Sequence, residues 1–140
     1  MTHSCRVRFD MIKVKAEEIM NRSMMQVFVK DSKEALEFYR QAFNAEILCK
    51  YPDENGNYMH SELNAYGQII AVSEITEGVN PGNTMMFCFD FGSGHEKDIK
   101  TAYEVLKEEA ITCSPLDKCD YSSLQFVCTD KFGVTWCLFI

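Results

Sequence analysis

His60 and Glu62 are the two residues whose types and spacing most clearly suggest chemistry. They stand two positions apart in residues 58–65, a segment rich in alternating polar and apolar side chains. Residues two apart on an extended strand share a face, so the imidazole and the carboxylate should lie side by side. Such a pair can act as a general acid and base when its neighbours tune it toward neutral pH. The alternative is an ordinary pair on a solvated strand face.

A second set of candidates carries sulfur, amide, hydroxyl or aromatic groups. Methionine and phenylalanine side chains can form an adaptable apolar pocket, and polar ones can orient a ligand by hydrogen bonds. Cys137 is either a nucleophile or soft ligand, or an inert core thiol. The plain alternative for the rest is ordinary core and strand residues. The predicted ligand-binding set is Met24, Gln26, Phe28, Ser73, Met86, Gln125 and Cys137.

The elements that must position these residues follow from apolar periodicity and turn signals. Asp31 with Glu34 three positions later has the spacing of a capping box, which predicts a helix start. Asn55-Gly56 favours a hairpin. In the first half the pattern predicts strands at 25–30, 45–51, 58–65 and 68–74, with an amphipathic helix at 32–43.

The second half repeats this order after a linker at 77–83. The pattern predicts strands at 84–90, 111–114, 122–128 and 134–140, a helix at 95–110, and a loop at 115–121. We therefore expect a single α+β domain at 24–140, made of duplicated β-α-β-β-β modules at about 24–76 and 84–140. Their curved mixed sheet would leave a groove, the usual place for a small ligand. Residues 1–23 form an extension of open role.

Composition excludes several classes of protein. The chain has 140 residues and a net charge of −7, with 14 basic residues scattered among 21 acidic ones, so nucleic acid is not an expected partner. No apolar run approaches the roughly 20 residues that a membrane span needs. The seven cysteines are odd in number and contain no C-x-x-C pair, which favours reduced thiols and a cytoplasmic location.

Three stretches resemble the vicinal oxygen chelate (glyoxalase/bleomycin resistance/dioxygenase) superfamily, in particular its PhnB-like, demethylubiquinone-methyltransferase-like subgroup. Val29-Lys30-Asp31 followed by residues 35–39 is similar to the first strand and "FY" helix. Residues 59–63 are similar to the "HAEL" strand, and residues 129–136 to the closing "D-x-FG-x-x-W" motif. The resemblance covers about 24–140 and implies the duplicated fold, a small-molecule ligand and a homodimer.

The resemblance also implies positions for a divalent metal, held by His or Glu side chains from both halves. Those positions fall at Met24, at Ala71 or Ser73, at Met85 or Met86, and at Cys137. Since none is a His or a carboxylate, we expect a small-molecule-binding relative with no metal ligands assigned and no cofactor. The alternative is a metal-dependent lyase, isomerase or dioxygenase with non-standard ligands around His60 and Glu62. A third possibility is a partner-binding protein with residues 1–23 as a docking arm, and whether the chain is an enzyme is left open.

Overall fold

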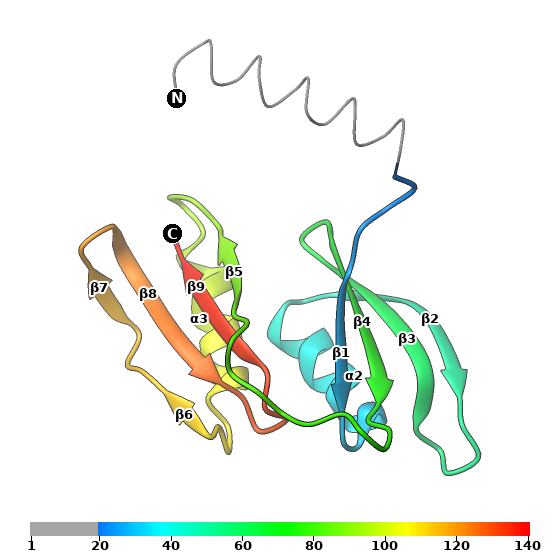
Figure 1. The fold of residues 1–140 in the computed structure, drawn as a ribbon. Coiled ribbons are helices and arrows are strands. Elements are labelled where there is room, and N and C mark those ends of the chain that lie inside the picture. The colour runs from blue at the N-terminus through cyan, green and yellow to red at the C-terminus, as the bar shows by residue number, and fades with distance from the viewer. Residues whose placement is uncertain (1–19) are drawn as a thin grey trace.

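The computed structural model describes residues 20–140, and these form two mixed sheets with a helix against each (Figure 1). The first half contains β1 (Met25–Val29), α2 (Ser32–Ala42), β2 (Glu46–Pro52), β3 (Tyr58–Ala65) and β4 (Gln68–Glu74). The second half contains β5 (Phe87–Asp90), α3 (Glu96–Leu106), β6 (Thr112–Cys113), β7 (Asp117–Cys119), β8 (Ser122–Thr129) and β9 (Thr135–Phe139). The predicted α+β class and the duplicated order are confirmed.

The predictions for the N-terminal extension and for the loop at 115–121 have different outcomes. Most of the extension, residues 1–19, lies outside the described residues, so its role as an arm stays a prediction, as do the domain boundaries. The expected loop at 115–121 is wrong in part, because β7 pairs with β8 inside it. A three-residue strand with a register shift carries no periodic pattern that a sequence could reveal.

The two sheets share one topology. In the first the strand order is β1-β4-β3-β2, and in the second it is β5-β9-β8-β6, with β7 also paired to β8. In each, the first strand runs parallel to the last strand of its half, and the other pairs are antiparallel. The strands β1 and β5 therefore stand at the sheet edges, where the two halves approach each other (Figure 1).

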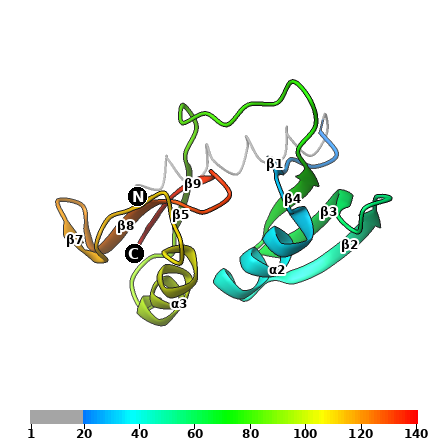
Figure 2. The same cartoon turned by 90° about the horizontal axis from the view of Figure 1, so that it is seen from below.

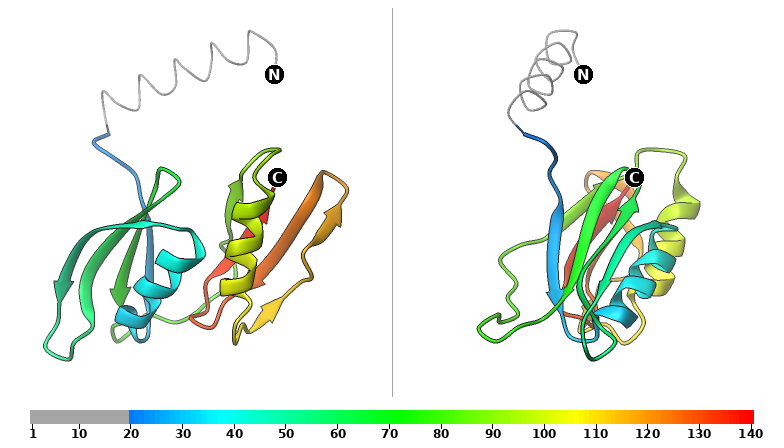
Figure 3. Two further views of the ribbon diagram at one scale, coloured as in Figure 1. Left: turned by 180° about the vertical axis from the view of Figure 1, so that it is seen from behind. Right: turned by 90° about the vertical axis from the view of Figure 1, so that its right-hand side faces the viewer.

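Each helix covers one face of its own sheet and leaves the other face open (Figure 2). Seen from the side, both helices lie in one layer and the strands in another, so the two open faces look toward the same side of the molecule (Figure 3). In β1, Val27 and Val29 are buried against the helix side, whereas Gln26 and Phe28 point to the open side. Within residues 20–140, no helix has the length and apolar character to cross a membrane.

The start of α2 is capped from a distant strand. Asp31 occupies the N-cap with a positive φ of 63° and makes no side-chain capping bond, so the predicted capping box is wrong. Instead the Glu74 carboxylate accepts hydrogen bonds from the backbone N–H of Asp31 (3.1 Å), and from the N–H (2.9 Å) and hydroxyl (2.8 Å) of Ser32. The negative charge of Glu74 at a helix N-terminus is favourable, and it ties α2 to the end of β4.

A buried carboxylate joins the two halves. Asp130 Oδ1 accepts hydrogen bonds from the backbone N–H of Phe132 (2.9 Å) and Val134 (3.1 Å), which closes the turn before β9. Its Oδ2 accepts from the Tyr39 hydroxyl of α2 (2.6 Å) and from Trp136 Nε1 (2.9 Å). This network gives Asp130, the backbone of Phe132 and the side chain of Trp136 a structural role.

Candidate functional site

His60 and Glu62 lie where the alternation of β3 predicts, on the open face of the first sheet. Ser61 and Leu63, which alternate with them, are fully buried on the helix side. Across the sheet, Glu62 stands opposite Cys49 of β2 and Ala71 of β4. Their predicted proximity is present in the structure, while their catalytic role stays a prediction.

Glu62 is the centre of a polar cluster, although only 6% of its surface is exposed. The guanidinium of Arg22 pairs with both carboxylate oxygens, with Nη2 at 3.3 Å from Oε2. His60 Nε2 lies 3.2 Å from Oε2, and the Cys49 thiol donates to the same oxygen at 3.5 Å. The hydrogen bond from Arg22 lowers the pKa of Glu62, against the opposing effect of burial. Glu62 is therefore held in its ionised form, in which it can accept hydrogen bonds or ligate a cation, and its lowered pKa makes it a weak base.

Sequence reasoning missed two members of this cluster. Arg22 falls in the segment that was assigned to the N-terminal extension, so no pattern linked it to Glu62. Cys49 could have been found, because it lies on the strand that forms a hairpin with β3 and its register places it opposite Glu62. Burial is the main cause that raises the pKa of the Cys49 thiol, followed by its hydrogen bond to Glu62.

The cluster offers three metal-ligating groups, of which His60 and Glu62 were the ligands of the alternative metal-dependent prediction and Cys49 was not assigned. One ligand atom each from Cys49, His60 and Glu62 all lie within 4.8 Å of one another. Sulfur, imidazole nitrogen and carboxylate oxygen are the ligand types that zinc prefers, at about 2.0–2.3 Å from the ion. These three side chains would hold such an ion, but Arg22 already occupies the carboxylate.

The positions that the family resemblance implies for a metal do not fit a hard or borderline ion. Ala71 has no donor, and the Ser73 hydroxyl accepts a hydrogen bond from Gln26 Nε2 at 3.1 Å. The other positions carry the sulfur of Met24, of Met86 and of Cys137. Thioether and thiol groups favour soft ions instead.

A cavity of about 650 Å³ lies between the two sheets, along the edge strand β1. Its walls are the strand itself, residues 75 and 79–82, residues 85–87 and the turn before β9. Four predicted ligand-binding residues line it, namely Met24, Gln26, Phe28 and Met86. Ser73 is not part of the lining, but its hydroxyl accepts a hydrogen bond from the amide of Gln26, which does line the cavity. His60 and Glu62 lie outside this lining.

The remaining predicted residues, Gln125 and Cys137, belong to a separate place on the open face of the second sheet. Gln125 Nε2 donates to Cys137 Sγ at 3.5 Å, and Cys137 stands opposite Cys88 of β5. The structure therefore does not gather the predicted residues into one site. It divides them between a polar cluster, a cavity and a thiol pair.

Comparison with known proteins identifies the family. The model of the Glyoxalase/Bleomycin resistance protein/Dioxygenase superfamily matches residues 21–138, whereas no curated protein matches. A PhnB protein from Bacillus cereus is similar in structure, with a TM-score of 0.70 and 23% identity over 84% of this chain and 98% of its own. FosX from Listeria monocytogenes, solved with Mn(II) and sulfate, has a TM-score of 0.61 and 16% identity over 86% of this chain and 90% of its own.

At these identities the solved structures establish the shared fold, and the family model establishes the relationship. The matched range of residues 21–138 includes the three motif segments at residues 29–39, 59–63 and 129–136. The chain therefore belongs to the Glyoxalase/Bleomycin resistance protein/Dioxygenase superfamily, the vicinal oxygen chelate group, and its place in the PhnB-like subgroup stays a prediction.

Proposed function

We propose that this protein binds a small, mostly apolar molecule in the cavity between its two sheets. The observation that carries the proposal is the gathering of large exposed apolar side chains at that cavity. Phe28 is 46% exposed, Met86 47% and Met85 83%, and all three line it. Exposed apolar surface of this kind is typical of binding sites, and about 650 Å³ suits a small organic ligand.

The lining combines adaptable and fixed groups. Methionine side chains can adjust their shape to different apolar ligands, because their thioether chains are flexible and polarisable. Gln26 is held in place, since its Nε2 donates to the Ser73 hydroxyl (3.1 Å) and to the Val27 carbonyl (3.0 Å). A fixed amide beside flexible apolar groups can orient one polar atom of a ligand while the rest of the ligand is buried by contact.

A dye-binding titration with matched variants tests this proposal. The probe is 8-anilinonaphthalene-1-sulfonate, whose fluorescence rises in apolar sites. Met86→Asp places a charge in the cavity wall, and we expect about tenfold weaker binding, equivalent to about 1.4 kcal/mol. Met59→Asp is the control, because Met59 is also exposed but lies on β3 outside the cavity. Equal weakening by both variants, or no binding by the wild-type protein, would contradict the proposal.

A second candidate function is metal-dependent chemistry at the polar cluster, which the approach of Cys49, His60 and Glu62 favours. Those three side chains would hold the ion, and a bound ion would polarise an oxygen atom of a substrate. Arg22 would have to leave the Glu62 carboxylate first.

Metal analysis of the full chain purified without chelator distinguishes the two candidates. Under the metal hypothesis Arg22→Ala strengthens Zn²⁺ binding, because it frees the carboxylate, and His60→Ala abolishes it. A protein without stoichiometric metal, whose Zn²⁺ affinity is the same in His60→Ala, would exclude the second candidate. The homodimer and the cytoplasmic location stay predictions. Sedimentation of the purified chain would test the homodimer.

A further inference from the structure

The open face of the second sheet carries two neighbouring thiols. Cys88 of β5 and Cys137 of β9 are directly opposite each other in parallel register. Adjacent strands lie about 4.8 Å apart, so the two side chains start from neighbouring positions. Both point away from α3, because the residues that alternate with them are in the core or packed against it, namely Phe87, Phe89, Trp136 and Leu138.

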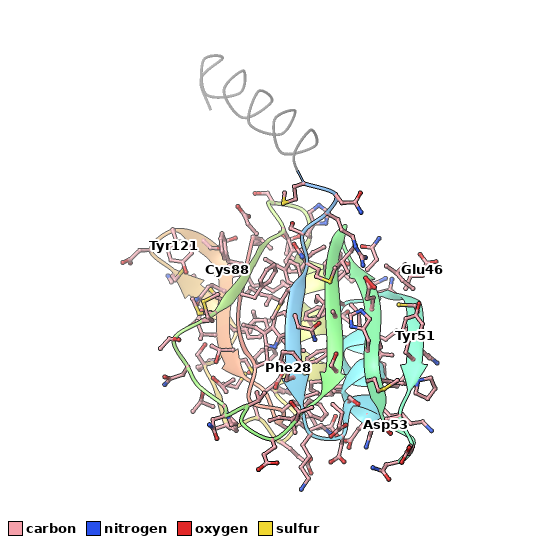
Figure 4. All side chains as sticks on the ribbon, turned by 45° about the vertical axis from the view of Figure 1, so that its right-hand side comes forward. Phe28, Glu46, Tyr51, Asp53, Cys88 and Tyr121 are labelled. Carbon is pink, nitrogen blue, oxygen red and sulfur yellow. The ribbon has the colours of Figure 1, made fainter. Side chains whose placement is uncertain are left out.

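The two thiols differ in access, and polar groups surround one of them. Cys137 is only 3% exposed, whereas Cys88 is exposed. Gln125 Nε2 donates to Cys137 Sγ at 3.5 Å, and the Tyr121 hydroxyl lies 4.0 Å from the same sulfur. Tyr121 lies in the turn between β7 and β8, and Figure 4 shows it and Cys88 on the same side of the molecule. Burial is the main cause that raises the pKa of the Cys88 thiol, and its hydrogen bond with Cys137 adds to this, so the two thiols are in contact.

We propose that Cys88 and Cys137 form a two-thiolate site for a soft, thiophilic metal ion of the Cu⁺ class. Thiolate ligands select soft ions, and two such ligands on one face suit an ion that accepts a low coordination number. Among the described residues, no third Cys, His or carboxylate group joins these two at metal-binding distance, which disfavours a tetrahedral zinc site. Binding would release the two thiol protons, and no electron is transferred.

A second thiol pair in the same sheet provides an internal comparison. Cys113 of β6 and Cys128 of β8 are also register partners, but Cys128 is fully buried beneath α3, where its thiol donates to the Leu106 carbonyl at 3.4 Å. Burial raises the pKa of Cys128 well above its ordinary value. This pair also consists of two cysteines on neighbouring strands, but Cys128 does not reach the open face. The pair should therefore not compete for the ion.

The test titrates the reduced full chain with Cu⁺ under anaerobic conditions, against a chromogenic Cu⁺ chelator. We expect one ion per chain, bound at least 100-fold more weakly in Cys88→Ser and in Cys137→Ser. Cys113→Ser should leave the affinity unchanged, because Cys113 belongs to the second thiol pair. Equal weakening by Cys113→Ser, or unchanged binding in Cys88→Ser, would overturn the proposal.

Two features keep this test independent of folding and of the cavity. If the buried Cys137→Ser variant does not fold, Cys88→Ser still decides the result, because the Cys88 side chain is exposed. The dye titration of the cavity in Cys88→Ser should match the wild type, since Cys88 is not part of the cavity lining. Failure of the thiol site would therefore leave the proposed function standing, and the reverse also holds.

Discussion

Replacing Asp130 by Asn should destabilise the protein, because four donors converge on its two carboxylate oxygens. Oδ1 accepts from two backbone N–H groups and Oδ2 from the Tyr39 hydroxyl and Trp136 Nε1. An amide keeps one oxygen and turns its NH₂ group toward two of these donors. If the NH₂ group replaces Oδ2, the Tyr39 hydroxyl can rotate to accept from it, but the Trp136 N–H is left without an acceptor.

The expected loss can be worked from these contacts. A buried unsatisfied donor costs about 1–3 kcal/mol, and each remaining bond weakens by about 1 kcal/mol when its acceptor loses charge. The amide recovers part of this, because the buried charge of Asp130 is itself unfavourable. We therefore expect a net loss of about 2–4 kcal/mol at pH 7, or on the order of 10 °C in Tm for a chain of this size.

Urea unfolding followed by circular dichroism measures the change, with Asp120→Asn as the matched control. Asp120 is exposed, so the control should stay within about 0.5 kcal/mol of the wild type. A double-mutant cycle with Tyr39→Phe should give a coupling energy of about 1 kcal/mol or more. If Asp130→Asn also stays within about 0.5 kcal/mol of the wild type, the network does not hold the two halves together as we argue.

The stability difference between the wild type and Asp130→Asn should depend on pH with a definite sign. Burial raises the pKa of Asp130 above its ordinary value of 3.8, against the opposing effect of its hydrogen bonds. A raised pKa in the folded state contributes stability below pH 3.8 that is lost as the pH rises through the folded-state pKa. The stability of the wild type relative to Asp130→Asn should therefore fall across that window, and an opposite slope would show that the hydrogen bonds outweigh burial.

Three further predictions concern a carboxylate pair, a helix cap and a turn. The lowered pKa of Glu62 contributes stability that is lost as the pH falls through the folded-state pKa. Glu62→Gln should therefore flatten the acid side of the curve of stability against pH. The effect should be about 1 kcal/mol or less, because Arg22 is half-exposed. Glu74→Ala should cost about 1–2 kcal/mol and speed hydrogen exchange in the first turn of α2, and unchanged exchange would exclude the distant cap. Gly133→Ala should cost about 1–3 kcal/mol in urea unfolding, because Gly133 has a φ of +89°, whereas Gly82→Ala should be neutral.

The sequence predicted the elements that carry a long periodic pattern. Residues 58–65 and 68–74 are strands with the predicted bounds, and the helix predicted at 32–43 spans 32–42. Alternation in β3 also placed His60 and Glu62 on one face, away from Ser61 and Leu63. These outcomes depend on local burial, which the order of apolar residues records directly.

Contacts between distant segments could not be predicted in the same way. The cap on α2 comes from Glu74, whose position depends on the parallel pairing of β1 with β4. The pairing of Cys88 with Cys137 depends equally on the register of β5 and β9. A single sequence records which residues are apolar, but it does not record which strand lies beside which, so both contacts were missed.

The Tyr39–Asp130 hydrogen bond spans 91 positions of the chain and has a consequence for how the duplicated halves can exist. If the chain were cut in its exposed linker at residues 77–83, one fragment would keep Tyr39 and Phe43, and the other would keep Trp136, 4.9 Å from the Phe43 ring centroid in the intact protein. Neither fragment could satisfy or bury these groups alone, so the halves should fold only on meeting each other. We therefore expect the two halves to act as a complementing pair, and a split version of this protein should report the encounter of its two fragments through the emission of its single tryptophan.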